Sequence, residues 1–340
     1  MSTNVSAALT LYCTSVYLSK MELSDANIGG LSAPPEDLNF ILKKLAPVFQ
    51  TDDFRNESIL LTGGTGFFGK WLTQTLLAMN DQWNLKNSLT ILTRSKAKAC
   101  NELPWLAYRP DVHFIESDIR SLKTEQEFST IIHGAAAASR DLNENHPEEM
   151  FNTILDGTRA ILKVAEDSKV KRVQLISSGA VYGTQPGKLD RVDELFTGAP
   201  DTTDPRSSYG EAKRAAEFLS VCSARKHGYH LSIARCYSFI GPYLPLDIHF
   251  AAGNFLKAVL DNDPIKIGGD GSPFRSYLYS ADLIVWLLTI LVKGESSKPY
   301  NVGSEDPVSI LDLAKAIDLQ GKKLVPDREK LSPSLMVAKT

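Results

Sequence analysis

The 340-residue chain lacks the features that would place it in a membrane, on nucleic acid or around a metal ion. It has no apolar run of membrane-spanning length, and its formal net charge of −3 comes without a basic stripe. Its six histidines show no ligand spacing with cysteines or carboxylates, which predicts that there is no metal site. Four scattered cysteines, with no C-x-x-C pair, are typical of a reduced, cytoplasmic protein. We therefore expect a soluble globular protein without metal, membrane or nucleic-acid partners.

Strand-like and helix-like segments alternate from about residue 58 onward. Strands that are apolar throughout, separated by helices, indicate a parallel sheet covered on both faces. The expected strands are 58–62, 89–93, 112–116, 130–133, 170–177 and 230–237. The expected helices are 66–80, 148–167, 208–226, 248–261, 280–293 and 308–318. This pattern predicts an α/β fold, a Rossmann-type doubly wound parallel sheet with a smaller C-terminal substrate lobe.

A glycine-rich turn, Thr62-Gly63-Gly64-Thr65-Gly66-Phe67-Phe68-Gly69, joins the first strand to the first helix of this alternation. Gly63 permits the turn, Gly66 lets the backbone approach a pyrophosphate, and Gly69 lets helix and strand pack closely. The helix N-terminus offers free N–H groups and a positive dipole end to phosphates. Glycine turns are common, but this placement predicts a dinucleotide site that includes Gly63, Gly66, Phe67, Phe68 and Gly69.

The end of the next strand bears on which nicotinamide cofactor is bound. An acidic residue there would accept hydrogen bonds from the adenosine ribose, yet no Asp or Glu lies between Gln82 and Cys100. Arg94 and Ser95 instead suit a 2′-phosphate, although a solvated surface arginine is the alternative interpretation. NADP is therefore favoured over NAD.

Further cofactor contacts are expected after the third and fourth strands. Asp118, followed by Ile119, is placed where a carboxylate would meet the adenine amino group. Ala135, Ala136 and Ala137 are small enough for a cofactor to lie against the backbone, although close helix packing would also need small residues. Together with the pattern of strands and helices, these motifs predict three chain segments. They are an N-terminal extension (1–56) with a helix at 35–49, an NAD(P)-binding Rossmann domain (57–240), and a region (241–340) that is mainly substrate lobe, interleaved with the sheet.

A tyrosine and a lysine four residues apart, Tyr209 and Lys213, begin another expected helix. This spacing puts both on one face, where the ammonium would lower the phenol pKa for proton exchange with a carbinol or carbonyl oxygen. Ser178 follows the end of the preceding expected strand, and ligands bind at the carboxyl ends of parallel strands. Ser178 would therefore hydrogen-bond the same substrate oxygen as Tyr209. A surface Tyr/Lys pair and a serine in a turn are the alternatives.

Together these ordered motifs resemble the extended short-chain dehydrogenase/reductases, specifically the NAD-dependent epimerase/dehydratase family of nucleotide-sugar enzymes. The resemblance runs from about residue 57 to about 318. Within this range it also includes the segments Arg235 to Pro242, Gly269 to Asp282, and Tyr300 to Gly303. It implies that Ser178, Tyr209 and Lys213 are catalytic, that Tyr209 and Lys213 also contact the cofactor, and that Ser178, Tyr209 and Arg275 bind substrate. It also implies a nucleotide-sugar substrate and a homodimer formed through helices 148–167 and 208–226.

Three departures from the family pattern refine this expectation. Dehydratases and decarboxylases of the family carry acidic residues just after the catalytic serine or threonine, but Gly179 and Ala180 stand here. Ser238 replaces the usual asparagine of a substrate-contact motif. The chain ends soon after Asp327, where relatives continue, which predicts a truncated substrate lobe.

These observations favour a reaction at C4 of a nucleoside-diphosphate hexose. The first hypothesis is a 4-keto (6-deoxy)hexose reductase, which agrees with Arg94 and with the missing acidic pair. The alternative is a C4 epimerase that holds NAD tightly through oxidation and re-reduction. A 4,6-dehydratase and a non-catalytic NADP-binding regulator are less favoured, because the acidic pair is absent and Ser178, Tyr209 and Lys213 are all present.

Overall fold

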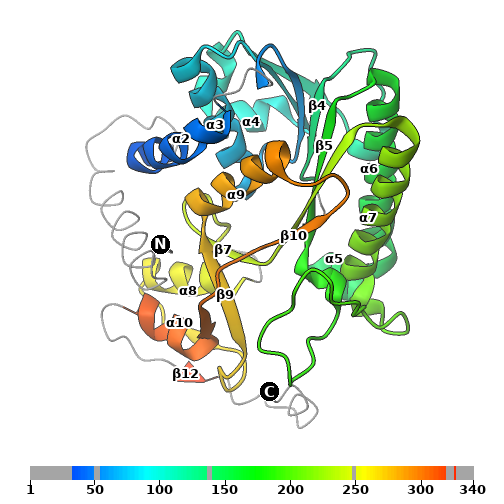
Figure 1. The fold of residues 1–340 in the computed structure, drawn as a ribbon. Helices are drawn as coiled ribbons and strands as arrows, with labels where there is room; N and C mark the ends of the chain where they lie inside the picture. The colour runs from blue at the N-terminus through cyan, green and yellow to red at the C-terminus, as the bar shows by residue number, and fades with distance from the viewer. Residues whose placement is uncertain (1–32, 50–53, 136–139, 247–249, 319–324, 327–340) are drawn as a thin grey trace.

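The protein is built around a seven-stranded parallel sheet, seen in a computed structural model that describes residues 33–49, 54–135, 140–246, 250–318 and 325–326 (Figure 1). Its strands are β1 (Ser58–Thr62), β2 (Ser88–Thr93), β3 (Val112–Glu116), β4 (Thr130–His133), β5 (Arg172–Ser178), β6 (His230–Cys236) and β10 (Pro299–Val302). They lie in the order β10-β6-β5-β4-β1-β2-β3. The order reverses between β1 and β4, which creates the crevice where doubly wound sheets bind ligands. The predicted Rossmann-like α/β fold is confirmed.

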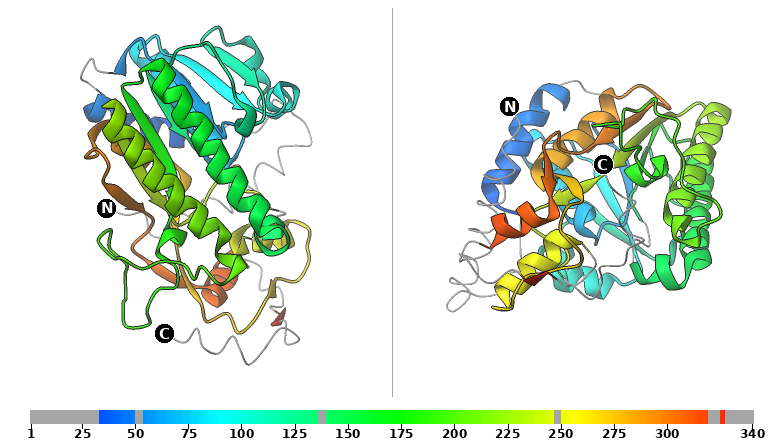
Figure 2. Two further views of the ribbon diagram at one scale, coloured as in Figure 1. Left: turned by 90° about the vertical axis from the view of Figure 1, so that its right-hand side faces the viewer. Right: turned by 90° about the horizontal axis from the view of Figure 1, so that it is seen from below.

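Helices cover both faces of this sheet. On one side lie α2 (Pro35–Phe49), α3 (Phe67–Trp83) and α9 (Ser280–Lys293), which contact one another. On the other side α6 (Pro147–Ser168) and α7 (Ser208–His227) lie side by side, as the left view of Figure 2 shows. Successive side chains of β1 point to opposite faces of the sheet. Ile59 and Leu61 pack in the core beneath α2, α3 and α9, and Leu60 packs in the core beneath α6 and α7. Burial on both faces explains why the strand is apolar throughout.

The N-terminal helix belongs to the body of the fold. The segment predicted to be helical, 35–49, is α2, and its residues Ile41 and Leu45 are fully buried against the α3 and α9 layer. The apolar face of α2 is therefore buried largely against α9, which lies more than 200 residues later in the chain.

A smaller lobe lies below the main sheet in Figure 1. It contains a three-stranded sheet in the order β11-β9-β7, formed by Pro307–Ser309, Phe274–Tyr279 and Ser238–Ile240. The helices α8 (Ala251–Leu260) and α10 (Ile310–Ile317) and the strand pair β8 (Lys266–Ile267) and β12 (Val325–Pro326) complete it. The lobe has its own core, in which Phe255, Ile265 and Leu313 are buried. Because α9 and β10 return to the main sheet, the C-terminal region is interleaved with it.

Short elements connect the larger ones. They are α4 (Lys96–Glu102), α5 (Arg140–Asn145), and the 3-10 turns η2 (Pro104–Tyr108), η3 (Ile119–Ser121), η4 (Gly179–Tyr182) and η5 (Pro205–Ser207). η4 directly follows the last residue of β5, and η3 begins two residues after β3 ends, so both come after the carboxyl ends of strands, where parallel sheets bind their ligands.

Candidate active site

The glycine turn adopts the geometry that its sequence requires. Gly63 has a φ of 75°, a left-handed conformation that favours glycine, and its carbonyl accepts a hydrogen bond from the Gly66 N–H at 3.0 Å. A Cβ on Gly69 would lie 2.0 Å from the Gly63 oxygen, so only glycine lets α3 start this close to β1. Both positions are therefore needed for the turn and the packing of the helix.

Gly66 is exposed at the start of α3. A Cβ there would meet only the Gly63 oxygen, at 3.3 Å. It is also the N-cap of α3, and no side chain caps the helix, so the first N–H groups of α3 remain available to an anion. An uncapped helix end beside an exposed glycine fits a dinucleotide pyrophosphate. Phe67 and Phe68 lie in the first turn of α3. The Phe68 ring packs edge-to-face against the Phe239 ring, with the ring centres 5.0 Å apart.

The expected adenosine contacts cluster after β2 and β3. Arg94 is exposed, and its charge contributes to lowering the pKa of the Asp118 carboxyl. The larger cause is Arg120, which donates hydrogen bonds to both Asp118 oxygens at 2.9 Å and holds that pKa at about 2. The Asp118 carboxylate would therefore share its lone pairs between Arg120 and an adenine amino group. Glu116 accepts a hydrogen bond from the Lys96 N–H at 2.7 Å, so one N–H at the start of α4 is already used.

The structure brings Ser178, Tyr209 and Lys213 together. Ser178 ends β5 and Tyr209 lies in the first turn of α7, and the Ser178 side chain is near enough to the Tyr209 phenol to act on its pKa. Ser178 Oγ also accepts the Ala180 N–H at 3.1 Å, which fixes the serine as the cap of η4. Lys213 is only 3 % exposed, and its Nζ donates to the Ile176 carbonyl oxygen at 2.8 Å. Serine and phenol oxygens thus converge at the carboxyl end of β5.

The expected lowering of the tyrosine pKa by the lysine is wrong for this structure. Burial raises the pKa of the Tyr209 phenol to about 12, and the nearby Ser178 side chain opposes that effect only in part. Lys213 Nζ lies 5.9 Å from the centre of the Tyr209 ring and is directed to a carbonyl oxygen, while burial lowers its own pKa to about 8. Desolvation outweighs charge attraction at this separation. Tyr209 is therefore a protonated phenol at neutral pH.

A chain of hydrogen bonds fixes the end of β4 beside the glycine turn. The Ala135 N–H donates to Thr62 Oγ1 at 3.0 Å, and Thr158 Oγ1 donates to the Ile154 carbonyl at 2.8 Å. His133 lies between the two threonines, 2.9 Å from Thr62 through Nδ1 and 3.3 Å from Thr158 through Nε2. Because Thr158 has used its proton, Nε2 carries the imidazole hydrogen and Nδ1 accepts from Thr62. Burial lowers the His133 pKa to about 3, so this arrangement is neutral.

The start of α7 is held by residues that the sequence motifs did not identify. Asn143 of α5 accepts hydrogen bonds through Oδ1 from Ser208 Oγ at 2.9 Å and from the Tyr209 N–H at 3.3 Å. Its amide group donates to the Arg206 carbonyl at 2.9 Å. A Cβ on Gly210 would lie 2.7 Å from the Ala180 carbonyl oxygen, so glycine lets α7 approach η4. Asn143 has no local sequence signal, because its partners lie more than 60 residues away.

A buried ion pair lies behind the site. Arg235 Nη2 and Glu217 Oε2 are 2.7 Å apart, and Glu217 Oε1 accepts a hydrogen bond from Ser177 Oγ at 2.5 Å. Arg235 also donates to the Tyr182 hydroxyl at 2.8 Å, which in turn donates to Asn301 Oδ1 at 2.8 Å. This network ties β5, β6, α7 and β10 together. The position of Glu217, four residues after Lys213 on the same helix face, is the signal that would have indicated it.

The remaining predicted residues lie in three places. Arg275 is exposed on β9, where its Nη1 donates to the Phe274 carbonyl at 2.7 Å, and it pairs in register with Val308 of β11. Ser238 begins β7, directly beyond the end of β6. Ala136 and Ala137 lie outside the described residues, as do the segments 1–32 and 327–340 of the predicted extension and lobe.

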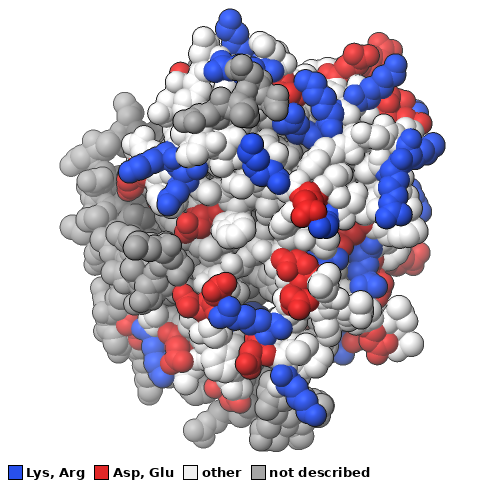
Figure 3. Space-filling model, in the orientation of Figure 1, with Lys and Arg blue, Asp and Glu red and all other residues white. Residues whose placement is uncertain are grey.

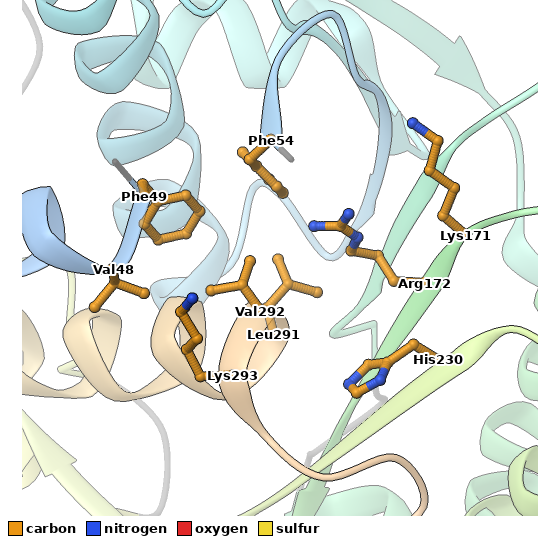
Figure 4. Close-up of a pocket in the computed structure, with 9 residues that line it drawn as sticks. All are labelled: Val48, Phe49, Phe54, Lys171, Arg172, His230, Leu291, Val292 and Lys293. Carbon is orange, nitrogen blue, oxygen red and sulfur yellow. The ribbon is translucent and has the colours of Figure 1, made fainter. Parts of the chain in front are cut away.

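A cavity of about 230 Å³ lies away from this site (Figure 4). It is lined by Val48, Phe49, Phe54, Lys171, Arg172, His230, Leu291, Val292 and Lys293. Arg172 and His230 are the first residues of β5 and β6, whereas Ser178 is the last residue of β5. The cavity therefore lies at the amino ends of these strands, opposite the candidate active site.

Acidic and basic side chains are interspersed on the face shown in Figure 3. None of the helices among the described residues has the length and apolar character needed to cross a bilayer.

Comparison with known proteins supports the family resemblance. Residues 59–303 match the NAD dependent epimerase/dehydratase family. UDP-glucuronic acid decarboxylase 6 of Arabidopsis thaliana is 29% identical over 279 residues, which cover 81% of this chain and 76% of the relative. UDP-glucuronic acid decarboxylase 1 of Danio rerio is 26% identical over 308 residues, covering 90% and 70%.

Solved structures agree in fold. UDP-glucose 4-epimerase of Thermotoga maritima, solved with UDP-glucose, superposes with a TM-score of 0.69 at 22% identity, covering 79% of this chain and 85% of the epimerase. UDP-glucuronic acid 4-epimerase of Bacillus cereus, in complex with NAD, has a TM-score of 0.67 at 23% identity, covering 79% and 86%. The family match spans well over half of the chain. The chain therefore belongs to the NAD-dependent epimerase/dehydratase family of nucleotide-sugar enzymes.

Proposed function

We propose that this protein is an NADPH-dependent reductase of the C4 carbonyl of a nucleoside-diphosphate 4-keto hexose. The observation that carries the proposal is the composition of the site at the end of β5. Ser178 and the Tyr209 phenol lie together there, while the two residues after Ser178 are Gly179 and Ala180 and supply no carboxylate. Such a site has a proton donor for a carbonyl oxygen but lacks the acidic side chains that elimination or decarboxylation uses in this family.

The protonation state of Tyr209 suits the reductive direction. A bound nicotinamide cofactor supplies the hydride for such a reduction. Tyr209 donates the phenol proton to the C4 oxygen, so that the carbonyl becomes a secondary alcohol, and Ser178 hydrogen-bonds the same oxygen. The phenolate then regains a proton from solvent. An oxidation would instead require Tyr209 to lose its proton first, which a pKa of about 12 disfavours in this structure.

Lys213 and the glycine turn are the groups expected to hold the cofactor. Lys213 Nζ, which donates one hydrogen bond to the Ile176 carbonyl near the carboxyl end of β5, would donate its other hydrogens to the nicotinamide ribose hydroxyls, and the uncapped N-terminus of α3 would bind the pyrophosphate. Exposed Arg94 would pair with a 2′-phosphate, which favours NADPH over NADH.

Nucleotide sugars are the substrate class that relatives handle, as shown by the decarboxylases of UDP-glucuronic acid and the epimerases of UDP-sugars. Arg275 is the residue expected to contact the diphosphate, because its exposed guanidinium makes no ion pair within the described chain. Decarboxylation, the activity named for those sequence relatives, is not proposed for this chain, because Gly179 and Ala180 supply no acid.

A C4 epimerase is the second candidate. Ser178, Tyr209 and Lys213 suffice for oxidation and re-reduction at one carbon, and epimerases are among the solved structures that share the fold. The two functions differ in how they use the cofactor. An epimerase returns each hydride and retains NAD, whereas a reductase consumes one NADPH per product.

The test is to incubate the purified protein with a panel of nucleoside-diphosphate hexoses and 4-keto hexoses, with NADPH and with NADH in parallel. Mass spectrometry should detect a product 2 Da heavier than the 4-keto substrate, formed faster with NADPH and abolished in Tyr209→Phe. An epimer formed without net cofactor consumption, with NAD retained through purification, would establish the epimerase instead. No conversion of any sugar would reject both.

A further inference from the structure

Tyr237 lies between two glycines at the edge of the site. A Cβ on Gly179 would lie 2.7 Å from Tyr237 Cε1 and 2.9 Å from Cζ. A Cβ on Gly303 would lie 3.3 Å from Tyr237 Cβ and 3.4 Å from Cδ2. The ring therefore has Gly179 along one edge and Gly303 along the other. Real Cβ atoms do not approach ring carbons as closely as 2.7 Å, so the Gly179 position is free of a side chain because the tyrosine ring fills that space.

The backbone holds this ring next to the reacting groups. Tyr237 directly follows β6, whose last residue, Cys236, pairs in register with Ser178. The Tyr237 N–H donates to the carbonyl of Val302, the last residue of β10, at 3.1 Å. Because Gly179 directly follows Ser178, the phenol carbon of Tyr237 lies against the residue next to the serine that serves the C4 oxygen. The position is set by three strands rather than by a loop.

The polar end of Tyr237 is available to a ligand. The side chain is 39% exposed, although the ring edges are packed. Its hydroxyl makes no hydrogen bond to any residue that the structure describes. Burial raises the pKa of this phenol, so it is neutral near pH 7 and can donate as well as accept. A neutral hydroxyl at the mouth of a site matches the hydroxyl groups of a sugar.

We propose that Tyr237 is a specificity-determining residue that takes the place of the side chain after Ser178, filling the space at Gly179 and hydrogen-bonding a sugar hydroxyl beside the reacting carbon. The proposal rests on the proposed nucleotide-sugar function and extends it to the residue that orients the sugar. A carboxylate at position 179 would collide with the ring, so the same tyrosine that binds the sugar also keeps an acid away from C4 and its neighbours. The site is thereby restricted to proton transfer by Tyr209.

The direct test is Tyr237→Phe, which keeps the ring and removes only the hydroxyl. Loss of one neutral hydrogen bond to the substrate should lower kcat/KM for the sugar by about 3- to 10-fold. The dissociation constant for NADPH should stay unchanged, as should the melting temperature, because the packing against Gly179 and Gly303 remains. Tyr108→Phe is the matched control, since Tyr108 is 86% exposed on η2 and should change nothing.

A double-mutant cycle tests the steric part. Gly179→Ala alone should reduce kcat/KM for the sugar at least 10-fold, because the new methyl group displaces the Tyr237 ring. In a Tyr237→Leu background the same change should cost little, so the two effects should be non-additive. Additive effects would overturn the steric coupling. If Gly179→Ala does not fold, Tyr237→Phe alone still decides whether the hydroxyl contacts the sugar.

Binding measurements separate this proposal from the reductase itself. Calorimetric titration of wild type and Tyr237→Phe with UDP-sugars, in the presence of NADP, needs no turnover. Weaker sugar binding by Tyr237→Phe, with no reduction of any 4-keto sugar by wild type, would reject the reductase and support the role of Tyr237. Equal binding by the two proteins, or no binding of any sugar by wild type, would overturn the role of Tyr237.

Discussion

At the scale of single residues, Lys213 shows how function and stability oppose each other in this site. Its side chain is 3 % exposed, and its ammonium group has a carbonyl oxygen rather than a carboxylate as its direct partner. Burial lowers the Lys213 pKa from 10.5 to about 8, which means that the fold disfavours the charged form. The cofactor-binding role proposed for Lys213 would therefore be kept at the expense of stability.

We predict that Lys213→Met stabilises the fold at pH 7 while abolishing turnover. With a folded pKa of about 8 and an unfolded value of 10.5, the unfolded chain binds more protons between those pH values, so wild-type stability should rise with pH across that window. The variant should lose this rise and gain on the order of 2 kcal/mol at pH 7. Urea unfolding from pH 7 to 10.5 measures both effects.

Lys123→Met, at an exposed position, serves as the control and should leave the slope unchanged. A Lys213→Met protein that is less stable than wild type at pH 7, with the wild-type slope retained, would contradict the prediction. It would mean that the hydrogen bond to Ile176 outweighs the cost of burying the charge.

At the scale of elements, the junction of β1 and α3 separates two uses of glycine. Gly69 is needed by the fold, since its Cβ would collide with the Gly63 carbonyl oxygen at 2.0 Å. Gly66 is exposed at an uncapped helix end, where a Cβ would meet only the Gly63 oxygen, tightly, at 3.3 Å, so its missing side chain mainly leaves room for a ligand. The two glycines should therefore respond differently to the same substitution.

We predict that Gly66→Ala loses less stability than Gly69→Ala, since its Cβ contact with the Gly63 oxygen is 3.3 Å and not 2.0 Å, but binds NADPH at least 10-fold more weakly, because the methyl group occupies the approach to the pyrophosphate. Gly69→Ala should lower the melting temperature by several degrees or prevent folding, because α3 must move away from β1. Thermal unfolding and fluorescence titration with NADPH distinguish the two. Equal loss of stability in both variants would show that Gly66 also supports the packing of α3.

Helices and strands could be predicted where the spacing of apolar residues within the segment indicates which face is buried. The expected helix 280–293 matches α9, and 208–226 lies within one residue of α7, because long periodic segments carry their own signal. β7, β9, β10 and β11 were not predicted, because three to six residues with little apolar periodicity form strands only where a neighbouring strand pairs with them. The segment 66–80 begins at the glycine N-cap but continues to Trp83 in α3.

At the scale of the whole molecule, α6 and α7 form the outer layer of one face (Figure 2). Phe218 projects from α7 with 68% of its surface exposed, on the same helix face as exposed Arg214 and Cys222. A large aromatic side chain surrounded by polar residues is a frequent centre of a protein interface. We propose that two copies of the chain associate through this layer, as the family resemblance implies.

Phe218→Glu should then convert the protein to a monomer in light scattering after gel filtration, because the substitution places charges in the centre of the interface. Phe274→Glu is the control, because Phe274 is 63% exposed but lies on β9 of the smaller lobe. A wild-type monomer, or a dimer that survives Phe218→Glu and dissociates with Phe274→Glu, would place the interface elsewhere or remove it.

The sequence by itself indicated six of the seven strands of the main sheet, the glycine turn and the candidates Ser178, Tyr209 and Lys213, since each of these carries a local pattern or motif. Only the tertiary structure decided the state of those groups. Lys213 was expected to lower the pKa of Tyr209, but burial sets that pKa at about 12, and burial depends on how α7 packs against β5. The contact between Gly179 and Tyr237 joins residues 58 positions apart, and it arises because β5 and β6 are neighbours in the sheet.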